Sequence, residues 1–158
     1  MTATAKRVVY PFTQALPAAQ KLWNLSTLIL NDVEPARQQA AGTAHQQFVG
    51  SYSDQFVNRM QTSAQNAQTT AQNLQQAAIN IARSWADANH QQQLDAYFAM
   101  VKEKRNNKSD LEKAKEWVLN DNTDYGHPPA APAVPSQPDF APTPVPQAEV
   151  PGESYVIV

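Results

Sequence analysis

The side chains in this sequence that could carry acid–base or metal chemistry are its 3 histidines and 14 carboxylates. His45, His90 and His127 show no metal-ligand spacing, and none lies in a His-Glu-x-x-His pattern. The chain has no cysteine, so thiolate ligands, disulfides and a cysteine nucleophile are all absent. No serine lies in a Gly-x-Ser-x-Gly setting. The sequence therefore predicts no catalytic, cofactor-binding or metal site, and we expect a protein that is not an enzyme.

Charge and proline are distributed unevenly along the chain. All 12 lysine and arginine residues precede residue 122, whereas nine of the 12 prolines lie between Pro128 and Pro151. A net charge of −2 with so few basic residues gives no dense basic surface, which argues against nucleic acid as a partner. The chain has only 4 glycines, whereas the turns and phosphate-binding loops of an α/β enzyme need many.

The sequence shows neither a membrane span nor a secretory signal peptide. The apolar stretch that follows Lys6 and Arg7 is only three residues long and ends at Pro11. No run approaches the roughly 18 consecutive apolar residues of a transmembrane helix. We expect a cytoplasmic protein before any export, and an export route to the medium or cell envelope that needs no signal peptide.

The longest predicted element is a helix from residue 52 to about residue 105. No glycine or proline occurs between Ser51 and Tyr125, and this segment is rich in good helix formers. Ser51 and Asp54, which follow Gly50, form a capping-box pattern at the start of the helix. Apolar residues recur at steps of three and four and predict a narrow packing seam: Phe56, Met60, Ala64, Ala67, Ala71, Leu74, Ala78, Ile81, Trp85 and Ala88.

A first helix is predicted from residue 13 to residue 47, with a kink or break at 31–35 because Pro35 interrupts it. Its expected apolar face also follows steps of three and four: Leu22, Leu25, Ile29, Val33, Ala36 and Ala40. Residues 43–50 then connect the two helices. The fold class is therefore all-α, and the expected architecture is a long, coiled-coil-like antiparallel helical hairpin.

Two further segments complete the predicted organisation. Ser109 and Glu112 form a second capping box, which predicts a short third helix at 110–120. Residues 122–158 are rich in proline and alanine and acidic, so we expect a disordered tail whose Pro-x-x-Pro spacings belong to a spacer. The predicted parts are an N-terminal arm at 1–12, a helical domain at 13–121 and this tail at 122–158.

The triplet Phe48-Val49-Gly50 lies at the predicted turn, directly before the second helix. Together with residues 51–56 it resembles the Trp-x-Gly (WXG) motif family of small helical-hairpin proteins handled by type VII (ESX) secretion. The resemblance covers residues 13 to about 100 and implies that the glycine relieves the turn while the aromatic covers the end of the helix pair. Phe48 stands where the family has tryptophan. The family's Tyr-x-x-x-Asp/Glu export signal has only a weak analogue here, Trp117-x-x-x-Asp121.

The resemblance implies a non-enzymatic protein of an ESX-like secretion system that forms helix bundles as a secreted substrate, a co-secreted partner or a toxin escort. Its expected partners are a second copy or a related hairpin, together with a toxin or the secretion ATPase. Two alternatives stay open: a phasin-like surface coat and a phage or cell-envelope coiled-coil structural protein. The mostly alanine seam favours helix-on-helix packing over the wide apolar stripe that a surface coat needs.

The predicted helices also differ in length, about 80 Å against about 50 Å at roughly 1.5 Å per residue, so the second overhangs the first. Large apolar residues on or near the overhang predict contact with another helical protein in a four-helix assembly. The predicted residues of this helix-bundle interface are Leu74, Ile81, Trp85 and Phe98. Trp85 is the expected centre of the interface because a buried tryptophan is a frequent hot spot. The alternative, that Trp85 packs only inside its own hairpin, stays open.

Overall fold

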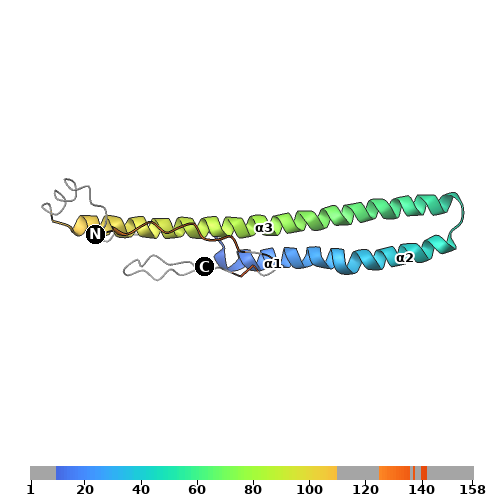
Figure 1. The fold of residues 1–158 in the computed structure, drawn as a ribbon, viewed down its shortest axis with the longest axis horizontal. Helices are drawn as coiled ribbons and strands as arrows, with labels where there is room; N and C mark the ends of the chain where they lie inside the picture. Colours follow the sequence, from blue (N-terminus) through green and yellow to red (C-terminus); the bar gives the residue numbers. More distant parts are fainter. Residues whose placement is uncertain (1–9, 110–124, 136, 138–139, 142–158) are drawn as a thin grey trace. The chain divides into compact units, whose positions relative to one another are not determined.

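The computed structural model describes residues 10–109, 125–135, 137 and 140–141. These residues form no strand, which confirms the predicted all-α class. The helical elements are α1 (Phe12–Leu28), the π-helix η1 (Ile29–Val33), α2 (Glu34–Gln47) and α3 (Ser51–Asn107) (Figure 1). The described residues fall into two compact units. The first unit comprises 14–82, 137 and 140, and the second comprises 10–13, 83–109, 125–135 and 141.

The predicted kink near Pro35 is a π-helical turn rather than a break. Proline cannot donate a main-chain hydrogen bond, and its ring clashes with the carbonyl four residues before it. In the structure Pro35 lies in the first turn of α2, directly after the π-helix. Directly before it, the Glu34 N–H reaches back five residues to the Ile29 carbonyl. The chain therefore stays helical from α1 into α2 with one wider turn.

The inward face of the first helical segment differs from the predicted one. Leu25 and Val33 are about half exposed, and Ala36 and Ala40 are exposed. For Ala36 and Ala40 the π-turn is the physical reason, because its extra residue rotates every later position around the helix. It does not account for Leu25, which precedes the π-turn. The buried residues instead include small and polar ones: Ala15, Leu16, Ala19, Ser26 and Glu34.

Helix α3 begins at Ser51, one residue before the predicted start, and ends at Asn107, two residues past the predicted end. All ten residues of the predicted seam are buried or half-buried, whereas most of the glutamine, asparagine and threonine residues between them are exposed. Ala71, Ala78 and Ala82 have no exposed surface at all. The alternating pattern of the sequence thus identifies the inward face of α3 correctly.

In the first unit, α1 and α2 lie beside α3 and run in the opposite direction (Figure 1). Two polar contacts fix the pairing of α2 with α3. Arg37 contacts Met60, and His45 contacts Ser53, so the residue number on α3 falls as the number on α2 rises. This is an antiparallel register, and it places the turn at 48–50.

The predicted third helix at 110–120 lies outside the described residues. Part of the tail, by contrast, is described, and the prediction of disorder is wrong for that part. In the second unit, Tyr125 is buried and residues 126–135 run as an extended segment along α3 (orange trace in Figure 1). The Tyr97 hydroxyl donates to the Gly126 carbonyl at 2.9 Å, and His90 Nε2 lies 3.2 Å from the Pro129 carbonyl oxygen.

A second part of the tail is held in the first unit by Phe140. Its side chain is only 4% exposed, and its ring meets the Trp23 ring edge-on with the centroids 6.0 Å apart. Its N–H donates to the Gln20 side-chain oxygen at 3.2 Å. Proline-rich backbone makes no internal hydrogen bonds, so its free carbonyls and N–H groups can pair with helix side chains. The expectation of a solvated spacer overlooked this possibility.

Candidate protein-interaction site

The turn between α2 and α3 is built by two backbone features. Phe48 ends α2 in an extended conformation, and its N–H donates to the Ala44 carbonyl at 3.0 Å. Gly50 then adopts a φ of 82°, in the left-handed region that glycine tolerates best. Its carbonyl accepts from the Ser53 N–H at 2.9 Å, which starts the first turn of α3. Phe48 and Gly50 thus both lie in the connection between α2 and α3.

Large hydrophobic side chains are exposed at this turn. Val49 is 89% exposed and Tyr52 is 76% exposed, while Phe48 is about half exposed. The Phe48 ring also contacts the Phe56 ring, with 5.7 Å between the centroids. We call Phe48, Val49 and Tyr52 the turn patch. Hydrophobic groups clustered on a surface mark sites of contact with other proteins more often than scattered ones do.

On the turn's partly buried side, His45 and Ser53 are joined by a short hydrogen bond. The Ser53 hydroxyl lies 2.8 Å from His45 Nδ1, and Ser53 is buried. This bond ties the last turn of α2 to the first turn of α3. It therefore holds the turn patch on a fixed backbone.

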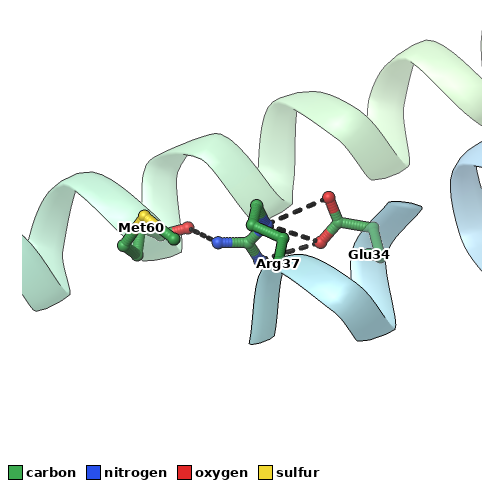
Figure 2. A network of polar contacts seen from close by, with 3 residues as sticks. All are labelled: Glu34, Arg37 and Met60. Carbon is green, nitrogen blue, oxygen red and sulfur yellow. Dashed lines mark hydrogen bonds and ion pairs between the residues drawn. The ribbon is translucent and has the colours of Figure 1, made fainter. Parts of the chain in front are cut away.

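Two turns further from the patch, Arg37 connects α2 to α3 (Figure 2). Arg37 Nε and Nη2 donate to the Glu34 carboxylate at 2.8–3.1 Å, and Nη1 donates to the Met60 main-chain carbonyl at 2.6 Å. The side chains of Arg37 and Glu34 are only 17% and 11% exposed. Such charges are tolerated away from water because they are paired and hydrogen-bonded.

The pairing also affects protonation. The side-chain hydrogen bonds to Glu34 raise the pKa of Arg37 above its ordinary value and outweigh the opposing effect of desolvation. A cation whose pKa is higher in the folded than in the unfolded chain stabilises the fold at pH values below its unfolded-state pKa. This stabilisation is lost as the pH rises through the folded-state pKa. Arg37 therefore stays charged throughout the physiological range, and this clamp between the helices does not weaken there.

The four predicted interface residues differ in their exposure. Leu74 and Ile81 are half-buried in the first unit, while Trp85 is 8% exposed in the second unit. Phe98 is 58% exposed. Thirteen residues separate it from Trp85, so at about 100° per residue it lies about 140° around α3. Trp85 is thus covered within a single chain, as an ordinary core residue would be. Trp117 and Asp121 lie outside the described residues.

Sequence reasoning missed two groups of contacts: the Glu34–Arg37 clamp, and the contacts of Tyr97 and His90 with the tail. Opposite charges three residues apart beside Pro35 were a visible signal for the first. The three-residue spacing of Pro129, Pro132 and Pro135 was a visible signal for the second. Neither signal predicts which group accepts the hydrogen bond that joins the two segments. In both cases the acceptor is a main-chain carbonyl far away in the sequence.

Among the residues that the structure describes, no group of three or more histidine, aspartate or glutamate side chains is placed to hold a metal ion. In the same ranges, no helix combines the length and apolarity that crossing a membrane requires. Comparisons of the chain with protein-family models, curated proteins and solved structures find no match. The resemblance to the WXG family therefore rests on the turn residues and stays a prediction.

Replacing Gly50 with valine is expected to lower the melting temperature. A residue with a β-carbon costs roughly 1–2 kcal/mol in the left-handed region, and a β-branched residue is least suited to it. No atom lies within 4 Å of the place that the new β-carbon would occupy, so the cost comes from the backbone alone. Thermal unfolding followed by circular dichroism at 222 nm measures the change.

Two other substitutions serve as controls. Gly50→Asn should lose much less stability, because asparagine tolerates the left-handed region. Gly42→Ala, in the interior of α2 and also with open space around it, should gain about 0.5–1 kcal/mol. The same melting temperature for Gly50→Val and wild type would show that the turn does not need its left-handed residue.

Proposed function

We propose that this chain is a non-enzymatic helical-hairpin protein that acts by packing against other helical proteins. We further propose that it does so in an ESX-like type VII secretion system, as a secreted substrate, a co-secreted partner or a toxin escort. The observation that carries the proposal is the turn patch: an aromatic-x-glycine triplet between two antiparallel helices, with Phe48, Val49 and Tyr52 exposed. An aromatic and a glycine at this turn are what the family resemblance requires.

The fixed backbone around the patch supports a binding role. The His45–Ser53 bond beside the patch, and the Arg37 clamp two helical turns away, hold α2 and α3 together. A partner would therefore meet hydrophobic side chains that need little further ordering, which lowers the entropic cost of association. The partner that this surface suits is a second copy, a related helical hairpin, a toxin or the secretion ATPase.

Light scattering during size-exclusion chromatography tests the proposal, on the full chain alone and mixed with the product of the neighbouring gene. Val49→Asp and Tyr52→Asp place a charge in the patch at positions so exposed that folding should not change. We expect a larger species for the wild type in at least one sample and its loss in both variants. Gln65→Asp, on the exposed side of α3, is the matched control and should assemble normally.

The secretion setting needs a separate measurement. In the native host, the protein should reach the culture medium, and inactivation of the ESX ATPase should abolish its appearance there. Export that continues without the ATPase contradicts the secretion proposal. A chain that stays monomeric at micromolar concentration, alone and with its neighbour, contradicts the bundle-forming proposal.

A further inference from the structure

The extended segment on α3 shows a regular pattern of burial. Pro129 and Pro132 are half-buried and Pro135 is buried, whereas Pro128, Ala131 and Val134 are exposed. A polyproline II helix has three residues per turn, so residues three apart share one face. The segment therefore presents one row of prolines inward and a second row of side chains outward. This is the burial expected of a polyproline II helix docked along one side.

The spacing of the contacts on α3 matches the repeat distance of a polyproline II helix. Tyr97 and His90 are seven residues apart on α3, which corresponds to about 10.5 Å along an α-helix. The carbonyls that they contact, on Gly126 and Pro129, are three residues apart, or about 9.3 Å along a polyproline II helix. Two turns of α-helix thus nearly equal one turn of polyproline II, and the same side of each helix returns to the contact.

A third contact closes the segment's N-terminal end. The Lys108 ammonium lies 4.6 Å from the centre of the Tyr125 ring, within the range of a cation–π interaction. Gly126 follows with a φ of 71°, which turns the chain from Tyr125 into the extended segment. The Tyr97 hydroxyl and the His90 imidazole on α3 thus contact two carbonyls of the segment, and the Lys108 ammonium, one residue past the end of α3, contacts the Tyr125 ring.

We propose that His90, Tyr97 and Lys108 form a binding site for a polyproline II peptide with proline at every third position. We call these residues the proline face. Its occupant is the chain's own segment Tyr125–Pro135. This function goes beyond the proposed role in helix bundles and does not depend on it. The Pro-x-x-Pro segment is accordingly a ligand for its own chain. While the segment is docked, its inward prolines are unavailable to other proteins.

A binding experiment on the full chain tests the site. A triple variant replaces the inward prolines: Pro129→Ser, Pro132→Ser and Pro135→Ser. Without these prolines the segment should leave the proline face, and we call this variant the vacated chain. A fluorescent peptide with the sequence of residues 125–135 is then titrated into this variant and followed by anisotropy. We expect it to bind the vacated chain at least tenfold more tightly than the wild type, because in the wild type the tethered segment competes at high effective concentration.

Matched variants separate recognition from nonspecific contact. The control is a triple variant that changes as many residues on the outward row: Pro128→Ser, Ala131→Ser and Val134→Ser. It should exclude the peptide as the wild type does. Adding Tyr97→Phe to the vacated chain removes one hydrogen-bond donor and should weaken peptide binding about three- to tenfold. A peptide with the same composition but irregular proline spacing should bind no more than weakly.

Several results would overturn the proposal. One is that the peptide does not bind the vacated chain although that chain keeps its helical signal. Another is that the peptide with irregular proline spacing binds as tightly as the regular one. The third is that Tyr97→Phe does not change the affinity for the peptide. If the triple variant loses its helical signal, Tyr97→Phe alone in the full chain replaces it. Chymotrypsin cleavage after Tyr125, which is buried while the segment is docked, should then be faster than in the wild type, and an unchanged cleavage rate contradicts the site.

Discussion

Replacing Trp85 with alanine is expected to lower the free energy of unfolding by about 3–5 kcal/mol, the usual cost of truncating a buried tryptophan. Trp85 is 8% exposed within the single chain, so its removal leaves a cavity that neighbouring residues fill only in part. Urea unfolding followed by circular dichroism measures the change. The helical content before unfolding should stay close to that of the wild type.

Phe98 provides the matched control, because it lies on the same helix and is 58% exposed. Phe98→Ala should change the free energy of unfolding by no more than about 0.5 kcal/mol. The sequence alone suggested a different role for Trp85, at the centre of a contact with a partner. That role predicts a dissociated assembly with unchanged stability of the chain. Such a result would contradict the role of Trp85 as a core residue of the single chain.

Enlarging Ala78 to leucine is expected to cost about 1–3 kcal/mol, because extra methyl groups must be forced into a packed interface. Ala78 lies on the inward seam of α3 in the first unit and has no exposed surface. Leucine is nearly as good a helix former as alanine, so a loss of stability reports packing and not helix propensity. The melting temperature of Ala78→Leu against that of the wild type gives the effect.

Gln72→Leu is the control for this substitution, since residue 72 is exposed on the same helix. It adds a leucine of the same size outside the interface and should leave the melting temperature nearly unchanged. If Ala78→Leu proves as stable as Gln72→Leu, the helices are not in close contact at this position.

The sequence predicts α3 well because two independent signals agree along its length. The absence of glycine and proline after Gly50 allows a long helix, although it does not locate the end at Asn107. The steps of three and four between apolar residues indicate its inward face. The same reasoning fails on α2, where the inward positions are taken by Glu34 and Arg37. A hydrophobic pattern cannot identify an inward face that is held by a charged pair.

The tail was mispredicted for a related reason. Its composition predicts that it cannot form a core of its own. Composition does not indicate, however, that Tyr125 and Phe140 can be buried against helices that are already formed. The turn at 48–50 was predictable, since both the aromatic and the glycine carry local conformational preferences. Its exposed patch could not be assigned before the side chains were placed.

In three of the polar contacts of this protein, one partner uses its side chain and the other uses only its main chain. Arg37, Tyr97 and His90 each use a side chain, while their partners Met60, Gly126 and Pro129 use only a main-chain carbonyl. A carbonyl is present whatever residue occupies the position. In a saturation mutagenesis library, position 60 should therefore accept many helix-forming residues of similar size, and position 37 few. Pairs of positions that touch in this protein need not change together, so correlated substitution would be a poor guide to its fold.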